Sequence, residues 1–183
     1  MQHYSNTKFG IYLKYENGLA VLGLNGKRLF RVPDALTELT ETEKLDLDKN
    51  NLTELPASIS KLKNLIVLKL DNNKITELPV EIGDLRELKR LNVSNNQLVG
   101  LPTSIQRLTK LEWLDLDGNK LTELPAEIGD LRELRQLSVS HNPLTVDAIR
   151  RALKLRKKGV LVDGVAGKHG GYCSYLEVRK KPR

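Results

Sequence analysis

A leucine-led phrase recurs every 23 residues along most of this 183-residue chain. The phrase begins, without insertion or deletion, at Leu22, Leu45, Leu68, Leu91, Leu114 and Leu137. Self-similarity at a fixed period of about 20 to 50 residues is the signature of a repeat architecture, in which one small structural unit stacks on copies of itself. The chain is therefore expected to fold as a stacked array.

The same kinds of side chain return at the same places in each copy. A second aliphatic residue comes two positions after the first leucine, at Leu24, Leu47, Leu70, Val93, Leu116 and Val139. Asparagine comes five positions after that leucine, at Asn50, Asn73, Asn96, Asn119 and Asn142, whereas the first copy has Lys27. Proline follows at Pro33, Pro56, Pro79, Pro102 and Pro125. A strand, a turn and a return segment therefore have fixed places in the repeat.

The leucine spacing predicts one short strand per repeat. Leucines two positions apart lie on one face of a strand, and a lone strand must pair with the strand of the next repeat. The strands then form a parallel sheet with a spacing of about 4.8 Å, over a column of leucine side chains. Asparagine can bond the backbone groups exposed at the turn, so its repetition predicts a buried ladder. Proline suits the return segment because it fixes φ and donates no ladder hydrogen bond.

The phrase LTELPxxIxxLxxLxxLxLxxNxL runs from Leu52 to Ile75 and again from Leu121 to Leu144, with one aliphatic exchange in each copy, and it resembles the leucine-rich repeat family. The proline-containing form is similar to the Ras-binding group of intracellular repeats and to many bacterial repeat proteins. The resemblance implies an α/β solenoid of horseshoe shape, with a parallel β-sheet on the concave side and short turns or 3-10 segments on the convex side. It also implies that the sheet holds another protein, with small GTPases as one candidate class.

The pattern fails toward both ends of the array, and the end repeats of a solenoid need caps with a polar outer surface. Residues 22–145 hold five full repeats and a partial sixth, after which Asp147 and Ala148 replace the expected leucine and proline. We therefore expect an N-terminal cap in residues 1–21 and a basic C-terminal cap in residues 146–183.

Each cap has a local sequence signal. In the first, Asn17-Gly18 between two apolar runs predicts a two-residue β-hairpin turn. The second begins with an amphipathic helix whose predicted apolar face is Val146, Ile149, Ala152 and Leu153. Gly159 is expected to end that helix, and the segments VLVDG and YCSYLEV are interpreted as two short strands around a glycine-rich loop.

Composition excludes several classes of protein. Cys173 is the single cysteine, so no internal disulfide can form, and the first residues lack the charged-then-apolar pattern of a signal peptide. No stretch approaches the roughly 18 apolar residues of a membrane span. We expect a soluble, cytoplasmic protein and exclude a disulfide scaffold, a transmembrane protein, a collagen-like chain and a mostly disordered chain.

The register predicts which side chains line the concave face, because residues beside the strand leucines point away from the core. The position before the first leucine holds Val21, Lys44, Val67, Arg90, Trp113 and Gln136. The position after it holds Gly23, Asp46, Lys69, Asn92, Asp115 and Ser138, and two positions further come Asn25, Asp48, Asp71, Ser94, Asp117 and Ser140. The candidate partner-binding residues are Lys44, Asp46, Lys69, Asp71, Arg90, Asn92, Trp113, Asp115 and Gln136.

Two features of this face have alternative interpretations. Trp113 is the only tryptophan, and beside Arg90 it is a candidate for the main interface contact; it could also fold back over the leucine stems. The acidic row of Asp48, Asp71 and Asp117 would suit a basic partner surface, or it could bond the neighbouring strand and water. Calcium binding is disfavoured, because ligands about 5 Å apart on a flat sheet do not converge.

The positive charge is concentrated at the end of the sequence. Residues 1–145 contain 19 basic and 20 acidic side chains, whereas residues 146–183 contain 11 basic and 3 acidic ones. The candidate anion-binding residues on the predicted helix are Arg150, Arg151, Lys154, Lys157 and Lys158. They could bind nucleic acid, an anionic membrane or an acidic protein, or they could form the solvated face of a cap.

Catalytic, metal and cofactor motifs find little support. His3, His141 and His169 are scattered, and no histidine is paired in sequence with a recognisable nucleophile or metal motif. His169 and Cys173 are too few for a metal site, and Gly167-Lys168 is followed by histidine instead of the serine or threonine of a phosphate loop. We therefore predict no enzyme activity, no metal and no cofactor.

The function predicted from the sequence is a non-catalytic protein-protein interaction module that binds its partner on the concave face. Trp113 and Arg90 are assigned the main contacts, and the carboxylates are assigned selectivity for a basic or polar surface. The alternative is a protein that binds RNA, DNA or acidic lipid through the basic C-terminal helix, with the repeats as a scaffold.

Overall fold

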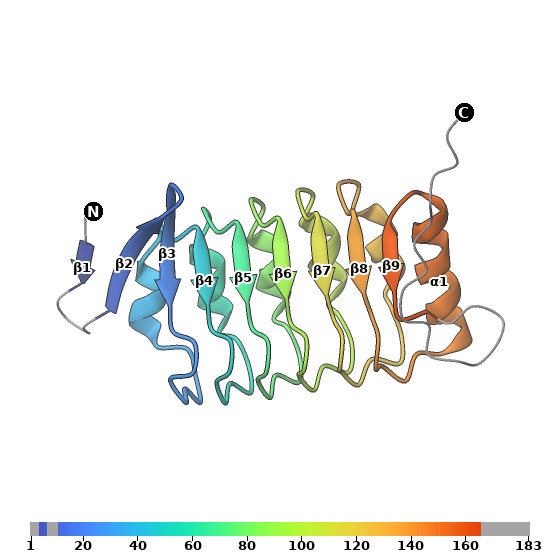
Figure 1. Cartoon of the computed structure of the whole chain (residues 1–183), viewed down its shortest axis with the longest axis horizontal. Helices are drawn as coiled ribbons and strands as arrows, with labels where there is room; N and C mark the ends of the chain where they lie inside the picture. The colour runs from blue at the N-terminus through green and yellow to red at the C-terminus, as the bar shows by residue number, and fades with distance from the viewer. Residues whose placement is uncertain (1–3, 7–10, 166–183) are drawn as a thin grey trace.

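The computed structural model describes residues 4–6 and 11–165, and in these residues nine strands form one sheet in sequence order (Figure 1). Three strands pair antiparallel at the N-terminal end: β1 (Tyr4–Asn6), β2 (Ile11–Glu16) and β3 (Leu19–Gly23). From β3 onward the pairing is parallel, through β4 (Lys44–Asp46), β5 (Val67–Lys69), β6 (Arg90–Asn92), β7 (Trp113–Asp115), β8 (Gln136–Ser138) and β9 (Leu161–Asp163).

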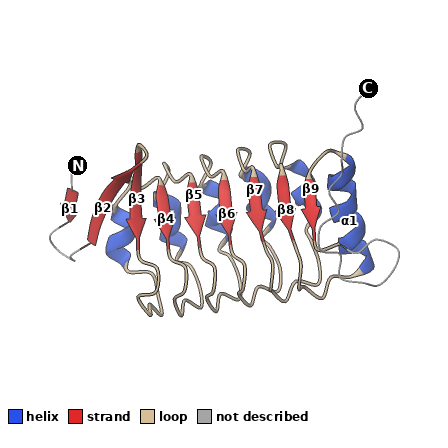
Figure 2. Cartoon of the chain, in the orientation of Figure 1, coloured by secondary structure: helices blue, strands red, loops and turns tan. Residues whose placement is uncertain are grey.

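Short 3-10 helices form the other layer of the solenoid, behind the sheet in Figure 2. They are η1 (Asp34–Glu38), η2 (Ala57–Lys61), η3 (Val80–Asp84), η4 (Thr103–Arg107) and η5 (Ala126–Asp130). Each begins directly after one of the repeated prolines, in extended backbone that the ring favours. The horseshoe class with a parallel sheet and 3-10 segments is thereby confirmed.

The core is a continuous column of aliphatic side chains between the two layers. The first strand leucines from the second repeat onward are fully buried, namely Leu45, Leu68, Leu91, Leu114 and Leu137. Full burial of one leucine side chain stabilises a fold by about 1.5–3 kcal/mol. Because these leucines pair in one register from strand to strand, side chains on either side of them must face outward together.

The asparagines form the expected ladder, and Asn73 shows its pattern. Its Nδ2 donates to the carbonyl of Leu70 in its own repeat, and to that of Leu47 in the preceding repeat, both at 3.0 Å. Its Oδ1 accepts from the backbone N–H of Leu52, also at 3.0 Å. An asparagine in the first copy would have no preceding repeat to bond, which explains why Lys27 can take its place.

The N-terminal end of the parallel sheet is closed by a hairpin. Glu16 pairs with Leu19 across a turn in which Asn17 (φ 52°) and Gly18 (φ 81°) have the positive φ values of a type I′ turn. The backbone N–H of Ala20 donates to Glu43 Oε2 at 2.7 Å. That carboxylate therefore replaces a backbone acceptor at the junction between the antiparallel and parallel strands.

Helix α1 (Val146–Lys157) follows the last asparagine turn, and the Thr145 hydroxyl accepts from the N–H of Ala148 as its N-cap. The predicted apolar face is wrong in part, because Val146 is 63% exposed. Ile149 and Leu153 are only partly buried, and the fully covered side chains are Ala148, Ala152 and Leu155. The helix is therefore rotated relative to the prediction.

The segment VLVDG forms β9, which extends the sheet beyond the last recognisable repeat. Gln136 pairs with Leu161 and Leu137 with Val162, in the same parallel sense as the earlier strands. Gly159 (φ 95°) and Gly164 (φ 84°) bound this strand. The second predicted strand, YCSYLEV, lies outside the described residues.

Candidate protein-binding surface

The register brings eight of the nine candidate residues into two adjoining rows on the strand face, whereas Asp71 follows the end of β5. The row before the strand leucines contains Lys44, Val67, Arg90, Trp113, Gln136 and Leu161, each a Cα partner of the next. The row after them contains Asp46, Lys69, Asn92, Asp115, Ser138 and Asp163. None of the nine candidate residues is buried: Arg90 is exposed and the others are half-buried.

Trp113 lies at the centre of the first row. Its strand neighbours are Arg90 on one side and Gln136 on the other, at the spacing of about 4.8 Å between paired strands. The indole is half-buried, so part of its surface stays accessible beside an exposed guanidinium. Tryptophan and arginine are among the residue types most enriched at energetically dominant positions of interfaces.

Leu161 and Asp163 belong to the same rows, and sequence reasoning did not include them. Leu161 is 58% exposed and continues the row of Trp113 beyond Gln136, while Asp163 continues the row of Asp115. The signal that could have found them is the alternation in VLVDG, which buries Val160 and Val162 and leaves the residues between and after them outside. The face therefore gains one apolar and one acidic residue at its C-terminal end.

The carboxylates of the third position bond the adjacent repeat. Asp48 Oδ1 accepts from the N–H of Asp71 at 2.7 Å, and Asp117 Oδ1 accepts from the N–H of Ser140 at 2.6 Å. Asp71 Oδ1 accepts from the Ser94 hydroxyl at 2.8 Å. These bonds favour the local interpretation of the acidic row, since each carboxylate satisfies groups of the next strand exit.

Three carboxylates along this face have raised pKa values, and two of them lie in its C-terminal part. Burial raises the pKa of Asp115 and Asp117 above the ordinary value of 3.8, and neighbouring carboxylates including Asp163 raise it further. Asp48 has a raised pKa for the same first reason, burial. Hydrogen bonds from backbone N–H groups oppose these shifts. Ionised carboxylates here repel one another, so a cationic group of a partner would be favoured.

The possible metal ligands in the described residues are not arranged as in a metal site. In residues 4–6 and 11–165, no group of three or more His, Cys, Asp or Glu side chains is arranged to hold a metal ion. His141 lies in that part of the chain, whereas His3, His169 and Cys173 lie outside it.

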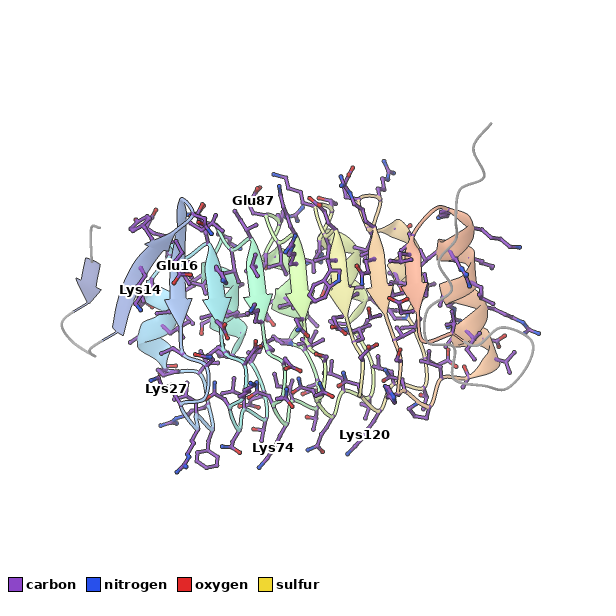
Figure 3. All side chains as sticks on the ribbon, in the orientation of Figure 1. Lys14, Glu16, Lys27, Lys74, Glu87 and Lys120 are labelled. Atoms are coloured by element: carbon purple, nitrogen blue, oxygen red, sulfur yellow. The ribbon has the colours of Figure 1, made fainter. Side chains whose placement is uncertain are left out.

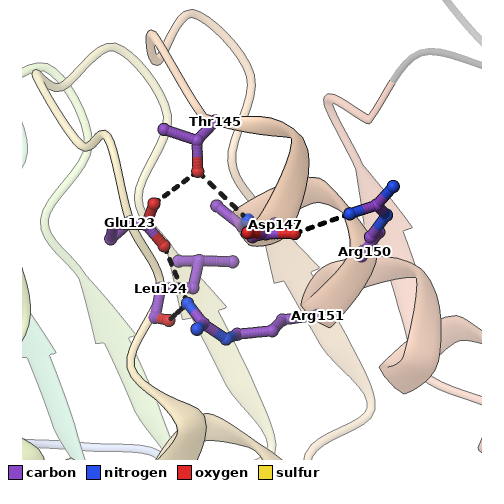
Figure 4. Close-up of polar contacts among 7 residues, drawn as sticks. Glu123, Leu124, Thr145, Asp147, Arg150 and Arg151 are labelled. Carbon is purple, nitrogen blue, oxygen red and sulfur yellow. Dashed lines mark hydrogen bonds and ion pairs between the residues drawn. The ribbon is translucent and has the colours of Figure 1, made fainter.

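The basic side chains of α1 divide into two groups. Figure 4 shows the contacts of the first: Arg150 pairs with Asp147 at 2.7 Å, and Arg151 pairs with Glu123 at 2.7 Å and donates to the Leu124 carbonyl at 2.8 Å. Lys158 donates to the carbonyl of Gly129 at 3.3 Å. The second group, Lys154, Arg156 and Lys157, is exposed and forms no ion pair within the described part of the chain. Arg151 and Lys158 thus connect α1 to the last repeat, as a closing element requires.

No helix within residues 4–6 and 11–165 combines the length and apolar character needed to cross a membrane.

Comparison with known proteins gives two family matches. A model described as leucine-rich repeat region matches residues 67–161, about half of the chain, and a single leucine-rich repeat model matches residues 41–62. No curated protein gave a significant match. Proteins of this family typically act as non-enzymatic scaffolds, and the fold generally mediates protein-protein interaction.

Solved structures with the same fold come from bacteria and a plant. A leucine-rich repeat protein of Leptospira interrogans is 34% identical, with a TM-score of 0.57, over 74% of this chain and 40% of its own. The receptor kinase ectodomain GASSHO1/SCHENGEN3 of Arabidopsis thaliana, in complex with Casparian strip integrity factor 2, is 31% identical, with a TM-score of 0.62, over 73% and 16%. An internalin of Listeria monocytogenes is 25% identical, with a TM-score of 0.63, over 75% and 39%.

The chain therefore spans well under half the length of these three proteins, and the likeness concerns their repeats. The unbroken 23-residue register, the parallel sheet, the asparagine ladder and the family match over residues 67–161 agree with one another. This chain belongs to the leucine-rich repeat family.

Proposed function

We propose that this chain is a non-catalytic binding module that holds a partner protein on its concave strand face. The observation that carries the proposal is the position of Trp113, in register with Arg90 and Gln136 on the face that the strands turn away from the core. Association of an aromatic side chain with arginine at the centre of a patch is typical of residues that dominate binding energy.

The surrounding residues supply the polar rim of this proposed site. Asp46, Asp71 and Asp115 would select a basic or polar partner surface, and the remaining candidates Lys44, Lys69, Asn92 and Gln136 would contribute rim contacts. Lys69 lies 3.7 Å from Asp46, so a partner must compete with an existing ion pair there. Leu161 would extend the apolar contact from Trp113 toward the C-terminal end.

The Arabidopsis ectodomain, which was solved in complex with Casparian strip integrity factor 2, supports a binding role as a family precedent. None of the three similar structures is described with a small GTPase, so we do not carry that partner class forward. A cytoplasmic location stays a prediction that depends on the single Cys173.

The test compares the intact chain with a double variant, Arg90→Glu with Trp113→Ala, in affinity capture followed by titration of the captured protein. The expected result is retention of a protein by the intact chain in high salt and at least about tenfold weaker binding by the double variant. The double variant should unfold at nearly the temperature of the intact chain, since neither Arg90 nor Trp113 is fully buried.

A matched control removes a cation and an exposed apolar group from the opposite layer, through Arg86→Glu with Val80→Ala. Val80 is 62% exposed at the start of η3, and Arg86 follows the same helix. The control should bind like the intact chain. Equal loss of binding in the control, or full binding by the concave double variant, would exclude this face as the site.

A further inference from the structure

The turn of the first repeat carries a cluster of exposed basic and aromatic side chains. We name Lys27, Arg28, Phe30 and Arg31 the basic-aromatic corner. All four residues are exposed, and Phe30, at 73%, is the most exposed large apolar residue within residues 14–165. The corner therefore places an exposed phenyl ring among three exposed cations.

The corner departs from the repeat at each of its four positions. The next repeat has Asn50, Asn51, Thr53 and Glu54 at the corresponding positions. Two of these exchanges turn a neutral residue into a cation, one turns an acid into a cation, and one turns threonine into phenylalanine. The lost ladder contact explains why an asparagine is dispensable at position 27, but it does not require lysine there or any of the other three residues.

The backbone of the corner is also distinct. Later turns have one residue with positive φ, such as Lys49 or Asn72, whereas the first turn has Gly26 (φ 66°) and Arg28 (φ 57°). A side chain other than glycine is disfavoured in this left-handed region. The arginine is therefore presented on an additional bend that the later repeats lack.

The three cations have no acidic partner among the described residues. The ion pairs in that part of the chain join other side chains. The contrast is with Glu123, which occupies the position of Arg31 four repeats further on and pairs with Arg151. Figure 3 shows Lys27, Lys74 and Lys120 along the edge where the strands end. The positive charge of the corner is therefore available to an external anion.

We infer that the basic-aromatic corner binds an anionic membrane surface. Cations close to such a surface each strengthen binding by about fivefold, and an aromatic side chain inserts at the level of the headgroups. A projecting turn with one aromatic residue can reach a planar bilayer. Single-stranded nucleic acid is instead bound in a groove by several stacked aromatic residues, which favours lipid over nucleic acid here.

The test measures binding of the whole chain to vesicles of phosphatidylcholine with about 30% phosphatidylserine, and to pure phosphatidylcholine vesicles, by co-sedimentation. The main variant restores the sequence of the second repeat through Lys27→Asn, Arg28→Asn, Phe30→Thr and Arg31→Glu. Each new residue already occupies that position in the next repeat, so the fold should be kept, and thermal unfolding checks this. The expected result is binding to the anionic vesicles alone, weakened by more than about 500-fold in this variant, since the three cations and Phe30 each contribute about fivefold.

A control with the same loss of four positive charges is Lys63→Glu with Arg132→Glu, two exposed cations in the turns that precede β5 and β8, and it should bind within about threefold of the intact chain. Phe30→Thr alone should weaken binding by about five- to tenfold. This factor should be similar at low and high salt, because the lost contribution is apolar.

Four outcomes would overturn the inference. They are no binding of the intact chain to anionic vesicles, equal binding to pure phosphatidylcholine, loss of binding in the Lys63 and Arg132 control with retention in the repeat-restoring variant, and tighter binding of a single-stranded RNA oligonucleotide than of vesicles at the corner.

Discussion

The middle of the solenoid and its two ends satisfy their backbone groups with different residues. In the middle, each asparagine bonds both its own repeat and the one before it, as Asn96 does with Val93 and Leu70. At the N-terminal end, a hairpin and the Glu43 carboxylate take over this role, and at the C-terminal end α1 replaces the 3-10 segment. A residue that recurs in every repeat is therefore required only where the repeats on both sides follow the same pattern. Other residues take its place where the repeat on one side is replaced by an end element.

The convex layer shows the same difference in its packing. Gly83 and Gly129 occupy the same position in two nearly identical segments, 75–91 and 121–137. A Cβ at Gly83 would lie 2.4 Å from the Ser104 carbonyl oxygen in the next repeat, whereas a Cβ at Gly129 would meet nothing within 4 Å. Local sequence is the same, so the difference comes from the neighbour: η4 packs closely on η3, but α1 leaves space beside η5.

The largest expected effect compares two asparagines. Asn96→Ala would leave the N–H of Ile75 and the carbonyls of Leu70 and Val93 without their side-chain partner in the buried ladder. We expect a loss of about 3 kcal/mol in the free energy of unfolding. Asn142→Ala, at the partly exposed last step, should lose only about 1 kcal/mol because water can replace the amide. Urea unfolding measures both, and equal losses would contradict the difference between middle and end.

The second expected effect compares the two glycines. Gly83→Ala should destabilise the chain by about 2 kcal/mol, because η3 or η4 must shift to admit the methyl group. Gly129→Ala should leave stability unchanged or raise it by about 0.5 kcal/mol, since alanine restricts the unfolded chain. Urea unfolding of the two single variants is the measurement. A larger loss at Gly129 would show that α1 packs more closely than described.

The smallest expected effect concerns pH and the acidic C-terminal part of the strand face. Asp115 and Asp117 have pKa values raised above 3.8, so the folded state binds more protons than the unfolded state in the window just above that value. Their contribution to stability is therefore greatest at low pH and is lost as pH rises through the folded pKa values. Asp115→Asn with Asp117→Asn should flatten this fall and raise the melting temperature at neutral pH by about 1–3 °C.

The control for the pH experiment is Glu133→Gln, an exposed carboxylate in the turn before β8. It should leave the pH dependence of the melting temperature unchanged. A double variant that melts lower than the intact chain at neutral pH would mean that the hydrogen bond from Ser140 to Asp117 outweighs the repulsion.

The repeat interior could be predicted closely from the sequence. The register of the strands, the buried leucines and the asparagine ladder all follow from the 23-residue period, because each repeat provides the same environment for the next. The rows that contain Trp113 and Asp115 follow from the same register. Their chemical use does not, since the identity of a bound partner leaves no trace in the period.

The C-terminal end could be predicted only in outline. A helix after Thr145 was expected, but both Val146 and Ala148 can start an apolar face, and the surface of the preceding repeat selects the second. Pairing of Leu161 with Gln136 was missed because β9 follows the preceding strand after 25 residues, not 23, and lacks the leucine phrase. The end elements are thus determined by tertiary contacts that a periodic search does not detect.

The ladder has a consequence for how such a chain can change its length. Each asparagine carries the donors and acceptor for one boundary between repeats, so a copied unit brings its own connections at both sides. Segments 75–91 and 121–137, 46 residues apart and nearly identical, fit duplication of a two-repeat unit. Gain or loss of whole repeats in the interior would keep the asparagine hydrogen bonds at every boundary between repeats. Insertion or deletion of one residue would break these bonds at one boundary. The array can therefore change its length by whole repeats during evolution, while the elements at its two ends stay unchanged.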